Sequence, residues 1–306
     1  MKVLVTGATG FVGQHVVAEL LKQGHAVVAV ARNVNKARDM PWFDSVEFIS
    51  CDLHESFTHL FKPGCIPDAI VHLSWTGLPN YRDFFHISKN LPADLAFLGA
   101  AVKSGVSHLI VAGTCLEYGM QYGPLTEEME TCPTTPYGFA KDTLRKALQL
   151  LQIEIPFTLQ WMRLFYMYGE GQNGNCLLSQ FDRAIRENQS EFRMSMGDQL
   201  RDYSPILAVA DSFATAIENP QCQGVINCCS GKPISVFDLV QQQRQSKSSS
   251  IALNRGYYPY PNYEPMAFWG VPAKLAALKS SHTSEQIDSV RMTKTPKRRV
   301  AAAVTC

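Results

Sequence analysis

Three side chains that can exchange or share protons occur at spacings that place them near one another. Tyr137 and Lys141 are four residues apart in a segment with helical spacing, so both lie on one face of that helix. A nearby ammonium favours phenolate, so we expect the pKa of the tyrosine to fall below its usual value of about 10. Thr114 ends an apolar, strand-like run, where its hydroxyl can reach the same substrate oxygen. The three residues predict proton exchange with a substrate oxygen near neutral pH.

The start of the chain must bring a cofactor to these side chains. An apolar strand over residues 2–6 runs into Gly7, Gly10 and Gly13, and an amphipathic stretch from Gln14 to Gln23 follows. Such a turn points backbone N–H groups at an anion, and the N-terminus of the helix adds partial positive charge. The pattern is typical of a site for a dinucleotide pyrophosphate, with Gly7 in the tight turn and Gly13 at the contact between helix and strand.

Strand and helix patterns alternate along the first half of the chain. Strands are expected at residues 25–31, 46–50, 67–73 and 107–112, and a helix at 91–104. This alternation predicts an α/β fold with a doubly wound parallel sheet. We expect a Rossmann-like domain over residues 1–170 with a return strand at about 206–230. A smaller substrate-binding region is expected at 171–205 and 231–279, followed by a disordered tail at 280–306.

The residue that ends the second strand bears on the choice of cofactor. Arg32 stands where an acidic residue would bind an adenosine 2′-hydroxyl, and Lys36 and Arg38 follow closely. This favours a seat for a 2′-phosphate, hence NADP(H), with NAD(H) possible; alternatively, Arg32 is simply a solvated strand end. Asp52 follows the third strand, where it can meet the adenine amine or cap the next short helix.

Composition narrows the classes of partner and location. A net charge of +1 gives no overall field toward nucleic acid or an anionic membrane, so a small-molecule ligand is expected. The nine cysteines show no CxxC pair and no metal-ligand spacing, which predicts reduced thiols and no metal site. There is no signal peptide pattern and no apolar run of 18 residues, so we expect a cytoplasmic protein without a membrane partner.

Taken together, the motifs resemble those of the extended short-chain dehydrogenase/reductase family, the NAD(P)-dependent nucleotide-sugar epimerases, dehydratases and reductases. The resemblance covers about residues 1–275. The matching segments are Thr6-Gly-Ala-Thr-Gly-Phe-Val-Gly13, Asp52-Leu53, His72-Leu73, Thr114 before Tyr118-Gly119, Tyr137-Gly-Phe-Ala-Lys141, and the later stretches 163–172, 197–203 and 224–231.

The resemblance implies roles for individual residues. Tyr137 becomes the general acid/base, Lys141 the residue that lowers its pKa and bonds the nicotinamide ribose, and Thr114 the hydroxyl partner. The implied cofactor-binding residues are Gly7, Thr9, Gly10, Phe11, Val12, Gly13, Arg32, Asp52, Leu53, Leu73, Ser74, Asn90, Tyr137 and Lys141. Asn90 is equally well read as an N-cap of the helix that Pro92 opens. A nucleotide-sugar substrate and a homodimer are also implied.

Substrate contacts are expected from Thr114 and from later segments. Tyr166 stands where many relatives have asparagine, which puts one substrate contact in doubt, and Arg201 matches a residue on the substrate phosphates. Residues 253–270 are rich in tyrosine and proline and suggest an aromatic wall, with Arg255 and Glu264 supplying directional bonds. The same segment could instead cap the small region or form a subunit contact.

The favoured reaction is reduction of a nucleotide-linked 4-keto-6-deoxy sugar by NADP(H), with hydride delivered to C4 and a proton from Tyr137. A nucleotide-sugar 4-epimerase with tightly bound NAD is the alternative. A non-catalytic nucleotide sensor is less favoured, because such proteins usually lack the tyrosine and lysine pair. Dehydration is disfavoured because Cys115 and Leu116 follow Thr114 where a second acid/base pair would be needed, although Glu117 is close.

Overall fold

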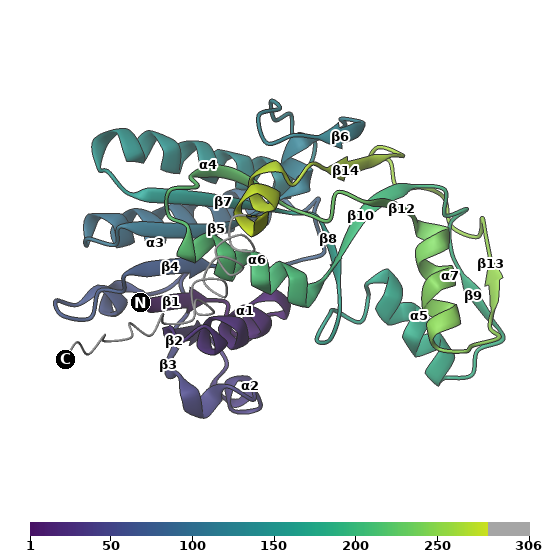
Figure 1. Ribbon diagram of the computed structural model, residues 1–306, viewed down its shortest axis with the longest axis horizontal. Coiled ribbons are helices and arrows are strands. Elements are labelled where there is room, and N and C mark those ends of the chain that lie inside the picture. The colour runs from purple at the N-terminus through teal and green to yellow at the C-terminus, as the bar shows by residue number, and fades with distance from the viewer. Residues whose placement is uncertain (281–306) are drawn as a thin grey trace, which may run out of the picture.

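The computed structural model describes residues 1–280 of the chain, and its centre is a seven-stranded sheet (Figure 1). The strand order is β11-β7-β5-β4-β1-β2-β3, and every neighbouring pair is parallel. The strands are β1 (Lys2–Thr6), β2 (Ala26–Ala31), β3 (Glu47–Ser50), β4 (Ala69–His72), β5 (His108–Thr114), β7 (Thr158–Leu164) and β11 (Gly224–Cys228). The predicted α/β class with a doubly wound parallel sheet is confirmed.

Helices cover both faces of this sheet. On one face α1 (Phe11–Lys22) packs with α6 (Ile206–Glu218), and their core includes Val17, Leu20 and Phe213. On the other face α3 (Leu91–Lys103) and α4 (Pro136–Glu154) bury Phe97 and Leu144. Because both faces are covered, β5 is buried at every residue, as its apolar sequence predicted. A short helix, α2 (Val34–Arg38), follows β2.

Short helical turns and strands complete the large lobe. The 3₁₀ helices are η1 (Phe43–Ser45), η2 (Thr58–Phe61) and η4 (Cys115–Tyr118), and η3 (His86–Asn90) is a π-helix that runs into α3. Strands β6 (Gly123–Leu125) and β14 (Phe268–Gly270) form a parallel pair. The η4 turn and the η3 turn follow β5 and β4, so both lie on the side where the sheet strands end.

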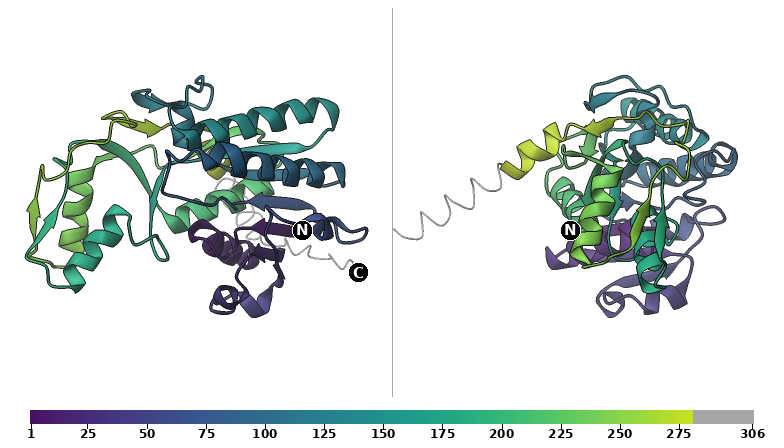
Figure 2. Two further views of the ribbon diagram at one scale, coloured as in Figure 1. Left: turned by 180° about the vertical axis from the view of Figure 1, so that it is seen from behind. Right: turned by 90° about the vertical axis from the view of Figure 1, so that its right-hand side faces the viewer.

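A second lobe lies beyond the carboxyl ends of the strands (Figure 2). Helices α5 (Leu177–Arg186) and α7 (Val236–Ser246) share a core that includes Phe181, Phe192 and Val240. Strands β9 (Glu191–Arg193) and β13 (Ala252–Asn254) pair beside them. The sheet β12-β10-β8, made of Pro233–Ser235, Leu200–Pro205 and Tyr166–Tyr168, leads from the large lobe to this one.

The structure adds detail to two of the predicted ranges. The stretch 206–230, expected to hold the return strand, contains α6 before β11. Residues 273–280 are helical, and the predicted tail lies outside the described residues from position 281 onward. The division into two domains stays a prediction.

The glycine turn fixes how close the first helix comes to the sheet. Gly7 has φ of 66°, which favours glycine, and a Cβ there would lie 2.9 Å from the Ser74 nitrogen. A Cβ on Gly13 would collide with the Gly7 carbonyl oxygen. The two glycines therefore allow β1, α1 and the segment after β4 to meet at one point. No helix of the described chain has the length and apolar character needed to cross a membrane.

Candidate active site

Two cavities meet at the carboxyl end of the sheet. The smaller, of about 280 Å³, is lined by residues that include Thr9, Arg32, Asp52, Leu53 and Ser74. The larger, of about 530 Å³, is lined by residues that include Phe11, Val12, Gly13, Thr114, Tyr137, Lys141, Tyr166 and Glu264. Both include Gly7, Gly10, Lys36, Leu73 and Trp75 in their walls. The glycine turn and the three acid/base candidates thus share one continuous site.

Helix α4 carries Tyr137 to this site. Its N-cap is Thr135, whose side chain accepts a bond from the Gly138 nitrogen at 3.1 Å, and Pro136 occupies the first turn. A Cβ on Gly138 would lie 2.6 Å from the Leu116 carbonyl oxygen, so glycine is needed for α4 to approach η4. The Tyr137 nitrogen also donates to the Tyr81 carbonyl at 3.1 Å. These contacts place the phenol beside Thr114.

Burial controls the protonation of the catalytic candidates. It raises the pKa of Tyr137 above 10, with Tyr81, Glu117 and Cys115 acting in the same direction, and the bond with the Thr114 side chain lowers it. The predicted fall in this pKa is therefore not what the structure gives, because desolvation of the phenolate dominates. Burial also lowers the pKa of Lys141 to about 8, against the influence of Asp94 and Glu117. The Lys141 Nζ atom lies over the Trp75 ring, 3.9 Å from its centroid.

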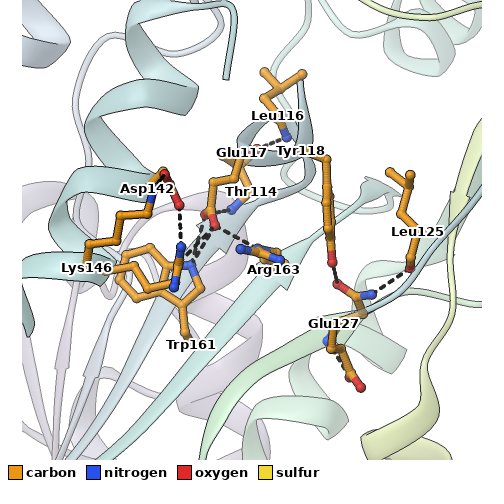
Figure 3. Close-up of polar contacts among 12 residues, drawn as sticks. Thr114, Leu116, Glu117, Tyr118, Leu125, Glu127, Asp142, Lys146, Trp161 and Arg163 are labelled. Carbon is orange, nitrogen blue, oxygen red and sulfur yellow. Dashed lines mark hydrogen bonds and ion pairs between the residues drawn. The ribbon is translucent and has the colours of Figure 1, made fainter. Parts of the chain in front are cut away.

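A buried polar cluster supports Thr114 from behind (Figure 3). Glu117 is fully buried and its Oε1 atom accepts a bond from the Thr114 nitrogen at 2.8 Å. The same carboxylate accepts bonds from Trp161 Nε1 at 2.9 Å and from Arg163 Nε at 2.7 Å. The Thr114 hydroxyl accepts from the Leu116 nitrogen at 3.2 Å, which completes a capping box. Glu117 is thus a support for Thr114 and does not line either cavity.

The smaller cavity brings together the residues predicted around the adenosine. The Arg32 Nη1 atom lies 3.7 Å from the Asp52 Oδ2 atom, and the Arg32 side chain is 62% exposed. Asp52 Oδ1 accepts a bond from the His54 nitrogen at 3.0 Å, within a turn and not at the start of an α-helix. Arg32 and Asp52 are therefore both at the cavity wall, where they can reach a ligand.

Asn90 is fully buried and lies outside the walls of both cavities. Its Nδ2 atom donates to the Thr76 carbonyl at 3.0 Å, and its Oδ1 atom accepts from the Thr76 hydroxyl at 2.9 Å. It makes no side-chain cap, because η3 continues directly into α3. The N-cap interpretation therefore fails, and Asn90 instead fixes the segment after β4 that runs beside both cavities.

Three predicted substrate residues form one cluster beside the larger cavity, whose wall includes Tyr166 and Glu264. The Tyr166 hydroxyl donates to Glu264 Oε1 at 2.5 Å, and Arg201 Nη2 donates to Glu264 Oε2 at 3.0 Å. Arg201 Nη1 donates to the carbonyl oxygens of Leu200 and Met266. The Arg201 side chain is only 3% exposed, so its donors face protein acceptors. The contact of Arg201 with a substrate phosphate stays a prediction. To make it, the guanidinium would have to give up one of these protein acceptors.

Arg255 lies apart from this cluster. Its Nη2 atom donates to Asp198 Oδ1 at 3.0 Å, its Nε atom donates to the Met196 carbonyl at 2.8 Å, and its guanidinium lies over the Phe237 ring. These partners belong to the second lobe, and Arg255 is absent from the walls of both cavities. Its predicted substrate contact also stays a prediction.

Sequence reasoning missed the aromatic residues that follow β4. Trp75 is a wall of both cavities, and Tyr81 lines the larger one, where its ring lies 5.6 Å from that of Tyr137. A signal was available, because four aromatic residues follow this buried strand closely: Trp75, Tyr81, Phe84 and Phe85. All eight cysteines of the described chain are free, and within that part no group of three His, Cys, Asp or Glu residues could hold a metal ion.

Comparison with protein families gives one match that spans most of the chain. The model of the NAD dependent epimerase/dehydratase family matches residues 3–229. This range contains the glycine turn, Thr114, Tyr137 and Lys141, and it includes every residue that lines the two cavities except Glu264.

Individual proteins are similar over almost the whole chain. A dTDP-6-deoxy-L-talose 4-dehydrogenase (NAD(+)) of Aggregatibacter actinomycetemcomitans is 29% identical over 88% of this chain and 99% of its own length. A UDP-glucose 4-epimerase of Corynebacterium glutamicum is 27% identical over 80% of each chain. The solved structure of a UDP-N-acetylglucosamine 4-epimerase from Methanobrevibacter ruminantium M1 has a TM-score of 0.81 at 20% identity, covering 90% of this chain and 91% of the other.

Proposed function

Because this chain belongs to the NAD-dependent epimerase/dehydratase family, we propose that it reduces a nucleotide-linked 4-keto-6-deoxy sugar at C4. The observation that carries the proposal is the single cavity in which Thr114, Tyr137 and Lys141 adjoin the glycine turn. The name of the Aggregatibacter relative, a 4-dehydrogenase of a dTDP-linked 6-deoxy sugar, supports this substrate class, because dehydrogenation is the reverse of reduction.

The chain supplies proton transfer and orientation for this reaction. Bound nicotinamide supplies the hydride that reduces the C4 ketone to an alcohol. Tyr137 donates its proton to the C4 oxygen, a role that suits a phenol whose burial keeps it protonated. The Thr114 side chain bonds with that of Tyr137, so its hydroxyl lies where it can donate to the same substrate oxygen. Its own oxygen accepts from the Leu116 nitrogen. Lys141, as an ammonium, stabilises the phenolate that remains.

The surroundings of Glu117 argue against dehydration. Elimination of water needs a second acid/base group beside the tyrosine, and Glu117 was the candidate nearest to Thr114. Its side chain is fully buried, forms an ion pair with Arg163 and is bonded to Trp161 and the Thr114 backbone. A carboxylate so placed cannot reach a substrate in the cavity, so reduction or epimerisation fits the site better.

For the cofactor we propose NADP(H), with NAD(H) as the alternative that the family's name favours. Arg32 is largely exposed at the smaller cavity, and Lys36 lines the same wall, so two cations are available to a 2′-phosphate. We expect Arg32→Ala to raise KM for NADPH about tenfold or more while leaving KM for NADH unchanged. Arg38→Ala is the matched control, because Arg38 does not line the cavity. Equal use of NADH and NADPH by the unaltered protein would reject this preference.

At the sugar end we propose that Glu264 accepts a bond from a substrate hydroxyl. Tyr166 and Arg201 each donate to one carboxylate oxygen, so the group is fixed at the cavity wall with acceptor capacity to spare. Thr114 lines the same cavity. The proposal gives Tyr166 and Arg201 a role in holding Glu264.

The direct test is oxidation of NADPH, followed at its own absorbance band, with dTDP- and UDP-linked 4-keto-6-deoxyhexoses. Turnover that depends on Tyr137 is the expected result. The 4-epimerase alternative has support from relatives such as the Corynebacterium enzyme. It would be favoured by NAD⁺ that co-purifies and resists dialysis, together with interconversion of a nucleotide sugar and its 4-epimer without added cofactor.

We also propose that the protein is a cytoplasmic homodimer. On α4, Leu150 is 66% exposed and Ile153 is 80% exposed, so a second copy could cover apolar surface there. Free cysteines fit a reducing compartment. Light scattering after size exclusion tests the dimer, and Ile153→Asp should reduce the measured mass to that of a monomer if α4 is the contact.

A further inference from the structure

Trp75 is an aromatic residue at the junction of the two cavities and touches both members of the proposed acid/base pair. Its ring carries the Lys141 ammonium 3.9 Å above its centroid. It also meets the Tyr137 ring edge-on, at 5.8 Å between centroids and 65° between planes. One side chain therefore contacts the general acid and its cationic partner from the side of the cofactor cavity.

The π-helix η3 holds this ring in place. Trp75 Nε1 donates to His86 Nδ1 at 3.0 Å, and the two rings stack at 20°. Because Nδ1 accepts this bond, the imidazole proton is on Nε2, which donates to the Asn80 carbonyl at 2.8 Å. Asn90, four residues along η3, bonds the neighbouring Thr76 through both its amide atoms. A π-helix often marks a functional site, and here it clamps the Trp75-Thr76 segment.

We propose that Trp75 is a positioning residue that holds Lys141 over its ring face as an ammonium ion. The ring face is the negative end of the aromatic quadrupole, so it attracts the charged form of lysine and leaves the neutral amine almost unaffected. This matters because Lys141 is 2% exposed, and a buried lysine otherwise tends to lose its proton. The inference rests on the proposed roles of Tyr137 and Lys141.

Other charged groups around Lys141 come from several elements. Asp94 of α3 and Glu117 of η4 favour the ammonium, while burial opposes it and lowers the pKa to about 8. His86 of η3 has a pKa below 6.5, because burial dominates and Lys141 acts in the same direction, against Asn80 and Asp83. Tyr137 and Tyr81 have pKa values above 10 because of burial. Between pH 7 and 9.5, Lys141 is therefore the group beside Trp75 whose charge changes.

The first test needs no substrate. The emission of Trp75 is obtained by subtracting the fluorescence of Trp75→Phe from that of the unaltered protein across pH 6.5 to 9.5. This emission should change with a midpoint near pH 8. The same subtraction is then made between Lys141→Met and the double variant Lys141→Met/Trp75→Phe, and its result should not change with pH. A flat difference signal, or an unchanged titration after Lys141→Met, would overturn the proposal.

The second test separates positioning from a purely structural role. In Trp75→Leu, the alkaline limb of the pH profile of kcat/KM should move to lower pH by about half to one and a half units. Trp75→Phe keeps an aromatic face, so its alkaline limb should lie much closer to that of the unaltered protein. Trp42→Leu is the control, because Trp42 is buried in the core between the sheet and α1 and should lower Tm without moving the limb. If the alkaline limb of Trp75→Leu lies at the same pH as that of the unaltered protein, the proposal is contradicted.

If no sugar substrate is turned over, the proposed function fails, while the fluorescence titration still decides the role of Trp75.

Discussion

Two parts of the wall of the larger cavity are built differently. Thr114 and Tyr137 lie at the end of β5 and the start of α4, in the large lobe. Tyr166 and Glu264 lie in β8 and in the segment before β14, on the way to and from the second lobe. Behind Thr114, the Glu117 carboxylate is fully buried and has three different donors. The Glu264 carboxylate is 10% exposed and has two donors, Tyr166 and Arg201.

This difference implies different consequences for mutation. Glu117 and its partner Arg163, which support Thr114, are buried in the large lobe. A change there should therefore lower both the free energy of unfolding and the turnover. The Glu264 cluster is held through side chains at the meeting of β8, β10 and the segment before β14, so a change there can alter ligand binding while the fold remains. The following predictions would sharpen or break this contrast.

Removal of the phenol hydroxyl should have the largest effect. Tyr137→Phe keeps the ring and its contacts with Trp75 and Tyr81, but removes the proton donor, so kcat should fall by about 10² to 10⁴. Cofactor affinity, measured by titration calorimetry, should stay within about twofold. A variant that keeps more than a tenth of the turnover would show that another group donates the proton.

Removal of the buried charge behind Thr114 should reduce stability next. Glu117→Gln leaves the Arg163 guanidinium buried with no anionic partner, and Arg163 is 1% exposed. We expect a loss of about 3 to 5 kcal/mol in the free energy of unfolding, measured with urea. Glu191→Gln is the matched control, because its partner Arg193 is 51% exposed and the urea midpoint should hardly move. Equal loss in the two variants would remove the distinction between the regions.

The sheet and the placement of the acid/base candidates in one cavity were predictable because they depend on local patterns. Apolar runs such as residues 107–112 are buried on both faces in any doubly wound sheet, and Gly7 is needed wherever the chain turns with positive φ. Tyr137 and Lys141 follow from helical spacing. By contrast, Glu264, the charge partner of Arg201, is 63 residues away along the chain, so no local pattern could show that the two side chains form an ion pair.

The protonation of Tyr137 illustrates a second reason. The sequence shows that a lysine is four residues away, but the pKa depends on how much water the fold removes from the phenol, and burial acts first. Trp75 was missed for a similar reason, since its ring contacts His86 of η3 and Lys141 of α4, which lie on separate elements. Contacts across separate elements decide both features.

Loosening the Glu264 cluster should change binding more than turnover. Tyr166→Phe removes the donor to Glu264 Oε1 at 2.5 Å and leaves the Arg201 bond intact. We expect KM for the nucleotide sugar to rise about tenfold, which corresponds to about 1.4 kcal/mol, with kcat reduced less than threefold. Urea unfolding should change little. A fall in kcat comparable with that of Tyr137→Phe would mean that the Glu264 cluster takes part in the chemical step.

The smallest effect is expected at Arg255, which the sequence placed on the substrate and the structure places against Asp198 and Met196. Its side chain is 35% exposed and that of Asp198 is 59% exposed, so their ion pair is screened by water and contributes little. Arg255→Ala should therefore leave kcat within about twofold and KM within about threefold of the unaltered values. Steady-state kinetics with the substrate that serves for Tyr166→Phe gives the comparison. A rise in KM as large as that of Tyr166→Phe would mean that Arg255 leaves Asp198 when the sugar nucleotide binds, and the sugar end would then extend into the second lobe.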